Sequence, residues 1–95
     1  MHEYSFEKLL IWQKGKTLAI QIYQITKKFP AEERFGLTNQ LRRASVSIAA
    51  NIAEGSCRKT NKDKSHFTNM AYTSLMEVLS HLIICKEMKY IKEPD

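Results

Sequence analysis

The chain has 95 residues, of which 43% are hydrophobic and 26% are charged, with only 3 Gly and 2 Pro. This length limits the chain to one domain, taken as residues 1–95, and the composition excludes a disordered or low-complexity polypeptide. The net charge is +5, which permits a nucleic-acid or anionic-surface partner without requiring one, since many domains carry such charge for solubility.

The two cysteines, Cys57 and Cys85, form neither a CxxC pair nor a disulfide framework. Reduced thiols in the cytosol are therefore expected. The N-terminal residues lack a basic stretch followed by a long apolar run, and no apolar run is long enough to span a bilayer. These features predict a soluble, cytoplasmic protein without a membrane partner.

Apolar residues recur at spacings of three and four along the first segment, which predicts a helix over residues 5–28. Ser5 is suited to cap its start, and Pro30 is suited to close it because the residue before a proline avoids the α region. Further apolar residues broaden the face beyond one stripe, so this helix is expected to be covered on more than one side.

A second helix is predicted over residues 31–59, with Gly36 bending or interrupting its first turns. Alanines and serines flank its apolar seam, and such small side chains allow a neighbouring helix to approach closely. A third helix is predicted over residues 61–90, where Thr60 and Asp63 resemble a capping box. No segment alternates with period two for long enough to form a strand.

Together these segments predict an all-α fold, an up-and-down antiparallel helical bundle. The apolar faces are wide for a bundle of only three helices. That width predicts either a fourth helix that covers them or an interface between copies of the chain.

The central stretch carries a distinctive set of short motifs. They are Phe29-Pro30, Phe35-Gly36-Leu37-Thr38, Gln40-Leu41-Arg42-Arg43-Ala44, Ser47-Ile48 and Asn51-Ile52-Ala53-Glu54-Gly55. With Ile11-Trp12-Gln13 and Tyr90-Ile91 outside this stretch, they resemble the four-helix bundle proteins encoded in intervening sequences of bacterial 23S ribosomal RNA genes. The similarity extends over nearly the whole chain.

The resemblance implies a four-helix bundle that assembles as a homo-oligomer, typically a pentamer. It also implies kinship with the accessory protein of diversity-generating retroelements, a basic pentamer thought to bind nucleic acid and its reverse transcriptase. Members of the family continue past the Tyr90-Ile91 pair into a fourth helix. This sequence stops at Asp95, so the fourth helix is expected to be missing, either naturally or by truncation. No activity is established for the family, and neither an enzyme nor a cofactor is expected here.

Two basic clusters are candidates for nucleic-acid contacts: Arg42 and Arg43 in the second helix, and Arg58, Lys59, Lys62 and Lys64 around the second connection. One interpretation is a set of salt-dependent contacts with RNA or DNA phosphates. The other is a solvated face with intrahelical ion pairs. Adjacent helical residues point about 100° apart, so one of Arg42 and Arg43 is expected to serve the bundle while the other faces solvent.

Three polar residues, Asn51, Glu54 and Glu77, lie within or beside the apolar seams. They are predicted to form a buried network that fixes helix register. The alternative is a carboxylate pair for metal or acid–base chemistry, but the Glu-x-x-His repeats of di-metal bundles are absent from the sequence. Glu77, His81 and Cys85 share one helix face, yet no other helix offers a matching Cys or His, so no metal site is predicted.

The sequence thus favours a non-enzymatic, oligomeric helical bundle that binds nucleic acid through a basic surface. The alternative is a structural or protein-binding scaffold that binds no nucleic acid. Trp12, Tyr23 and Tyr72 are expected to be packing or interface residues rather than walls of a ligand cage.

Overall fold

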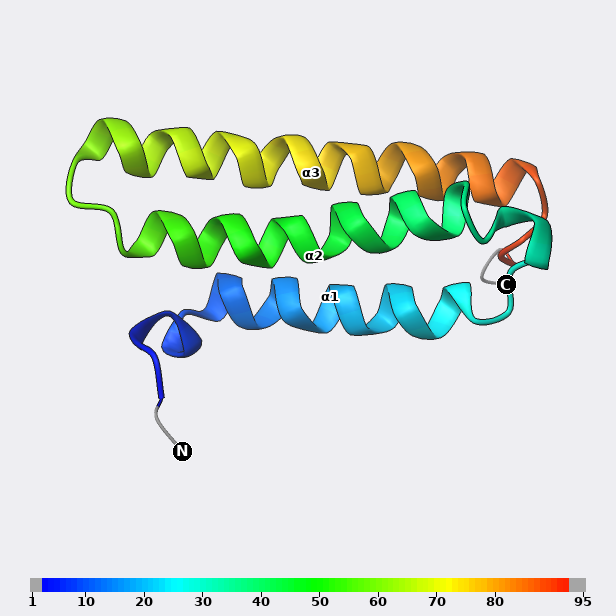
Figure 1. The fold of residues 1–95 in the computed structure, drawn as a ribbon, viewed down its shortest axis with the longest axis horizontal. Coiled ribbons are helices and arrows are strands. Elements are labelled where there is room, and N and C mark those ends of the chain that lie inside the picture. Colours follow the sequence, from blue (N-terminus) through cyan, green and yellow to red (C-terminus); the bar gives the residue numbers. More distant parts are fainter. Residues whose placement is uncertain (1–2, 93–95) are drawn as a thin grey trace.

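The computed structural model describes residues 3–92, and within them it contains helices and no strand. The elements are two short 3₁₀ helices, η1 (Ser5–Lys8) and η2 (Ala31–Glu33), and three α-helices, α1 (Leu10–Thr26), α2 (Leu37–Ser56) and α3 (Asn61–Glu87). Successive α-helices run in opposite directions, and α2 lies between α1 and α3 (Figure 1). The predicted all-α fold is therefore confirmed for the described residues. The expected absence of a fourth helix concerns the chain after Lys92, which lies outside the described residues.

The first predicted helix, residues 5–28, is divided into η1 and α1 by Leu9, whose backbone is extended (φ −74°, ψ 124°). Tyr4, and not Ser5, occupies the capping position, and its backbone N–H donates to Glu7 Oε2 at 2.6 Å. Aromatic contacts accompany this break. The Phe6 ring stacks on Tyr4 with centroids 5.6 Å apart and meets the Trp12 ring edge-on at 5.0 Å. These contacts fold η1 back against the first turns of α1.

The second predicted helix, residues 31–59, is shorter than expected because the connection after Pro30 forms η2 and α2 begins only at Leu37. Glu33 Oε1 accepts a hydrogen bond from the Leu37 N–H at 3.2 Å, so this carboxylate satisfies one free amide at the start of α2. A Cβ atom at Gly36 would lie 2.7 Å from Glu33 Oε1. A side chain at this position would displace the Glu33 carboxylate from the start of α2. The predicted interruption at Gly36 is confirmed.

The third predicted helix, residues 61–90, ends at Glu87, and the chain then turns through Lys89 (φ 64°). This turn returns Tyr90 to the α1–α2 connection, where its hydroxyl donates to Glu33 Oε2 at 2.9 Å. The Tyr90 ring also packs on Phe29, with centroids 5.5 Å apart. We refer to Phe29, Glu33, Gly36 and Tyr90 as the closed end of the bundle.

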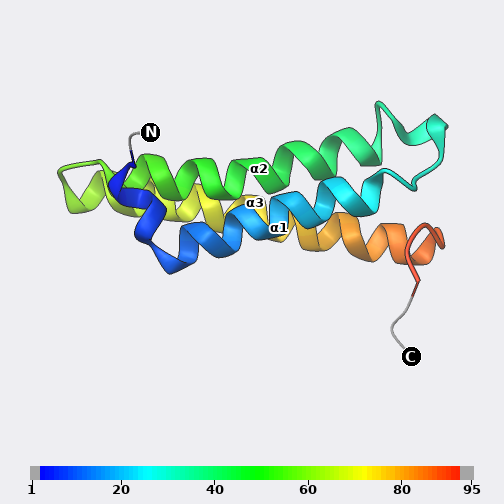
Figure 2. The same cartoon turned by 90° about the horizontal axis from the view of Figure 1, so that it is seen from below.

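The core follows α2, which packs against both of its neighbours. Its buried apolar residues are Ile22, Phe29, Leu41, Ala44, Ile48, Val78 and Cys85. In contrast, α1 and α3 have no Cα atoms within 8 Å of each other. In the perpendicular view of Figure 2, α2 lies to one side of the other two helices. Residues of α1, α2 and α3 line an open groove between α1 and α3.

Small residues permit close helix packing, as the sequence predicted. A Cβ atom at Gly15 would lie 3.5 Å from Ala49 Cβ, at the contact of α1 with α2. At the contact of α2 with α3, a Cβ atom at Gly55 would lie 3.0 Å from Phe67 Cβ, closer than ordinary packing allows. Gly55 therefore brings the end of α2 against the start of α3 and positions the connection between them.

Candidate nucleic-acid interface

The α2–α3 turn carries the densest group of exposed cations. The turn leaves α2 at Cys57, and Thr60 caps α3 by accepting a hydrogen bond from the Asp63 N–H at 3.1 Å. The cap predicted at Thr60 is confirmed by this bond. Because the cap fixes the first turn of α3, the lysines that follow project from a defined helix and not from a free loop.

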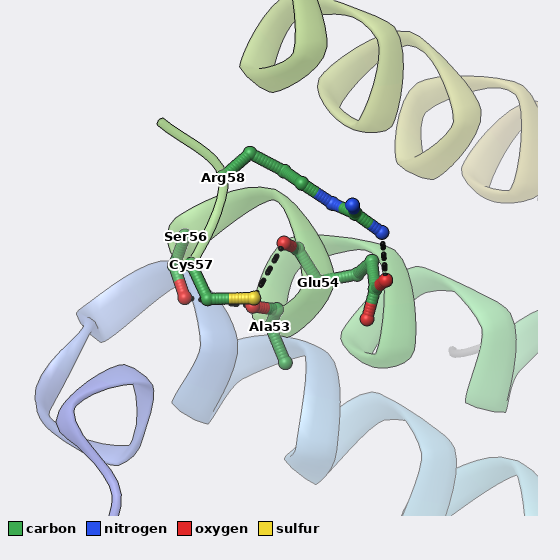
Figure 3. Close-up of polar contacts among 5 residues, drawn as sticks. All are labelled: Ala53, Glu54, Ser56, Cys57 and Arg58. Carbon is green, nitrogen blue, oxygen red and sulfur yellow. Dashed lines mark hydrogen bonds and ion pairs between the residues drawn. The ribbon is translucent and has the colours of Figure 1, made fainter. Parts of the chain in front are cut away.

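Arg58, at the start of the turn, is held by contacts within the chain. Its guanidinium forms an ion pair with Glu54 one helical turn earlier (Figure 3). The same group lies over the Phe67 ring, 4.7 Å from its centroid. Arg58 therefore links α2 to α3, and part of its charge is neutralised by the neighbouring carboxylate.

Lys59, Lys62 and Lys64 are all exposed, and we call them the turn lysines. No carboxylate of residues 3–92 lies within ion-pair distance of any of the three. They stand at the N-terminal end of α3, where the helix dipole adds positive potential. This is the part of the described surface whose geometry best suits contact with phosphates.

Arg42 and Arg43 divide their roles as the sequence predicted. The Arg42 Nε donates to Thr26 Oγ1 at 2.8 Å, and its guanidinium lies 4.6 Å from the centroid of the Tyr23 ring. Arg42 thus ties α2 to α1. Arg43 is exposed and borders a shallow polar hollow together with Ser74 and other residues of α2 and α3.

The two basic clusters do not form one continuous patch. Arg43 and Arg58 are separated by 15 positions of the sequence, most of them within α2, which at ~1.5 Å per residue places them about 22 Å apart. A single site that uses both clusters would have to follow the length of α2. The turn lysines are therefore treated as the candidate interface by themselves.

The structure corrects the predicted network of Asn51, Glu54 and Glu77. Glu54 and Glu77 are exposed, and each pairs on its own helix, Glu54 with Arg58 and Glu77 with His81. Only Asn51 contributes to a partly buried polar cluster, and its partner is Ser47 on the preceding turn. The carboxylates lie outside because ionised groups retain water unless buried partners compensate them.

The polar cluster that does cross the helices is built on serines. Asn51 Nδ2 donates to the backbone oxygen of Ser47 at 2.8 Å, and Ser74 Oγ donates to Ser47 Oγ at 2.9 Å. Ser47 and Ser74 occupy positions in the small-residue pattern of the two helices. This pattern of small residues predicted close packing of α2 and α3. Close packing in turn allows the hydroxyls of Ser47 and Ser74 to form a hydrogen bond.

Glu77, His81 and Cys85 lie on α3 but assemble no metal site. His81 Nε2 is 3.5 Å from Glu77 Oε2, within ion-pair distance, yet neither imidazole nitrogen has a hydrogen-bond partner. Cys85 is fully buried, and this burial raises the pKa of its thiol above the usual value. The negative charge of Glu33 is a second, smaller cause that raises the same pKa. Within residues 3–92 no three His, Cys, Asp or Glu side chains are placed to hold a metal ion.

The groove between α1 and α3 has a volume of about 690 Å³. It is mainly apolar, and its lining includes Ile11, Leu18, Ile48, Ile52, Tyr72 and Leu75. Lys14 and Lys64 lie at its border near the α2–α3 turn. The wide apolar faces noted in the sequence are therefore concentrated here, on surfaces that the three helices do not cover.

The model of one protein family matches residues 7–95 of the 95-residue chain. The matching family is described as 23S rRNA-intervening sequence protein. The chain belongs to this family. The resemblance drawn from the central motifs is thereby confirmed, and the matched range includes the turn lysines, Arg42, Arg43 and the closed end.

No curated protein matches the chain. No residue roles can therefore be taken from a characterised relative. In the part of the chain that the structure describes, no helix combines the length and the hydropathy needed to cross a membrane. The chemistry of the site must therefore be argued from its own cations, hydroxyls and apolar surfaces.

Proposed function

We propose that this protein is a non-enzymatic, homo-oligomeric helical bundle that binds the phosphate backbone of RNA or DNA through the turn lysines. The observation that carries the proposal is that Lys59, Lys62 and Lys64, within six positions of the chain, are exposed and have no carboxylate of residues 3–92 within ion-pair distance. Three such cations beside a helix N-terminus favour phosphates without reading bases. Assembly into a homo-oligomer, a pentamer by family resemblance, would repeat this cluster around the particle and add to its attraction for a polyanion.

The proposal predicts weak sequence preference and strong salt dependence. If each turn lysine contacts one phosphate of a single strand, affinity should fall about 20-fold between 50 and 200 mM salt. An electrophoretic shift assay with a single-stranded RNA across this salt range measures the slope. Absence of binding even at the lowest salt would contradict the proposal.

A matched pair of variants tests the location. The triple variant Lys59→Glu, Lys62→Glu, Lys64→Glu should abolish the shift. The control Lys28→Glu, Lys89→Glu, Lys92→Glu makes the same change in net charge with exposed lysines near the closed end. It should retain most of the binding. Equal loss in both variants would mean that net charge, and not the α2–α3 turn, determines the affinity.

The second candidate function is a scaffold that binds protein and no nucleic acid. The exposed apolar surfaces of the bundle favour it, because monomeric proteins rarely leave large contiguous apolar patches uncovered. Retention of the oligomer together with no RNA shift at low salt would select the scaffold over the nucleic-acid-binding protein.

We further propose that a fourth helix fills the groove between α1 and α3, as the family resemblance implies. Support comes from its apolar lining and from Lys14 and Lys64, which border the groove near the α2–α3 turn. A helix that runs antiparallel to α3 would end beside these lysines, and cations suit a helix C-terminus. A synthetic amphipathic helix with acidic residues in its last turn should therefore bind the groove. Leu75→Lys should abolish that binding, whereas Thr73→Lys, on the exposed side of α3, should not.

A further inference from the structure

A second apolar surface lies between α1 and α2, and we call it the α1–α2 surface. Its lining residues are Trp12, Lys16, Ala19, Ile20, Tyr23, Gln24, Lys27, Val46 and Ala49. None of them lines the groove between α1 and α3. A fourth helix in that groove would therefore leave the α1–α2 surface uncovered.

The α1–α2 surface has an apolar centre and a cationic border. Ile20 is 51% exposed and Val46 is 46% exposed. Lys16 lies over the Trp12 ring at 5.3 Å from its centroid, and Lys27 belongs to the same lining. The segment Leu10–Thr26 contains no acidic residue. Any partner that covers this surface is therefore expected to offer apolar side chains flanked by carboxylates.

The outer side of α3 offers that combination, and we call it the outer α3 surface. Its apolar residues Met70, Ile84 and Met88 are 45%, 44% and 52% exposed. Glu77 is exposed at the position midway between Met70 and Ile84, and Glu87 is exposed one turn after Ile84. Residues spaced by seven lie on one side of a helix, and methionines adapt well to a packed interface.

One chain cannot bring these two surfaces together. Both α1 and α3 pack on α2, which lies between them in the view of Figure 1, and α1 and α3 have no Cα atoms within 8 Å of each other. The α1–α2 surface is formed by α1 and α2, whereas the outer α3 surface is formed by α3 alone. Each copy can therefore offer one surface to the copy before it and the other to the copy after it. Such a head-to-tail contact generates a ring if the rotation closes.

We propose that the outer α3 surface of one copy packs into the α1–α2 surface of a second copy, with Glu77 and Glu87 facing Lys16 and Lys27. This inference rests on the proposed homo-oligomer and identifies the two faces that form it. Apolar burial supplies most of the affinity of such a contact, and the opposite charges determine its direction.

The decisive experiment uses two complementary variants measured by light scattering. Ile20→Asp disables the α1–α2 surface and leaves the outer α3 surface intact, whereas Ile84→Asp does the reverse. Each variant alone should lose the assembly and give the mass of one chain. An equimolar mixture should give the mass of two chains, because only one productive contact remains possible.

Matched controls test whether the contact is specific to these two surfaces. Ile83 is adjacent to Ile84 but is not part of the outer α3 surface, and it is 63% exposed. Ile83→Asp should keep the wild-type mass, and so should Leu10→Asp on α1. Circular dichroism of each variant should match the wild type, which excludes unfolding as the cause of any loss.

Other outcomes would overturn the inference. If the mixture stays at the mass of one chain, the contact joins two identical surfaces and is not head-to-tail. If Ile83→Asp dissociates the assembly while Ile84→Asp does not, a different side of α3 forms the interface. If both test variants keep the wild-type mass, the oligomer stands but these faces do not form it. A wild-type chain that is itself monomeric would instead contradict the proposed homo-oligomer.

Discussion

The closed end and the long sides of the bundle contrast in how much of their surface the chain itself covers. At the closed end, Phe29 is buried under the Tyr90 ring, and Glu33 has partners for both carboxylate oxygens. Along the sides, large apolar residues such as Leu10 remain mostly exposed. Where segments from all three helices meet, the chain satisfies its own polar groups. Where only two helices meet, apolar surface is left for another helix or another copy.

The largest expected effect at the closed end follows from the change Glu33→Ala. It removes the carboxylate that caps α2 and accepts the Tyr90 hydroxyl, so the free energy of unfolding should fall by about 2–3 kcal/mol. Urea denaturation followed by circular dichroism measures the change. Glu32→Ala is the matched control, because Glu32 is exposed and should shift stability by no more than about 0.5 kcal/mol. Equal effects would mean that the closed end depends on packing alone.

A smaller effect is expected for Tyr90→Phe, which keeps the ring on Phe29 and removes only the hydrogen bond to Glu33. The loss near neutral pH should be smaller than that caused by Glu33→Ala, because only one hydrogen bond is removed. Tyr72→Phe, on the exposed side of α3, is the control and should be nearly neutral.

The difference in stability between wild type and Tyr90→Phe should also depend on pH. The hydrogen bond to the Glu33 carboxylate, with burial as a second cause, raises the pKa of Tyr90 above the ordinary value near 10. The folded state thus prefers the neutral phenol, so this contribution is complete below pH ~10 and is lost as pH rises through the raised pKa. The stability difference between wild type and Tyr90→Phe should shrink above that pH. A difference that stays constant or grows would contradict the bond.

The mildest probe compares the two cysteines. Cys57 is exposed at the α2–α3 turn, whereas Cys85 is fully buried near the closed end, where burial raises the pKa of its thiol. With a thiol reagent at pH 8, Cys57 should react at once and Cys85 at least ~100-fold more slowly, because its reaction requires local opening. In Cys57→Ser only the slow phase should remain. Fast reaction of both thiols would mean that the closed end opens readily.

Much of the fold could be predicted from the sequence, because its signals are local. The three helical periodicities, the interruption at Gly36 and the cap at Thr60 depend on residues within a few positions of one another. The break at Leu9 was missed because the contacts among three aromatic rings that accompany it form only after the chain folds back. The bond between Glu33 and Tyr90 joins residues 57 positions apart, and no periodicity reports such a contact.

The candidate site shows the same division. The basic residues were evident in the sequence, and so was the division of roles between Arg42 and Arg43, since helical geometry alone requires it. The sequence did not separate Arg58, whose charge is paired with Glu54, from the turn lysines. The sequence also predicted a buried network for Glu54 and Glu77. A mixed pattern of polar and apolar residues does not show whether a polar side chain points into the bundle or into solvent.

The central claim is that copies of this chain cover one another's exposed sides. Static light scattering of the 95-residue chain over a concentration series tests it most directly. The claim predicts a mass that is a whole multiple of the 11.1 kDa chain and that is greater than one chain, with a plateau as concentration rises. A mass of a single chain across the whole series would contradict the claim.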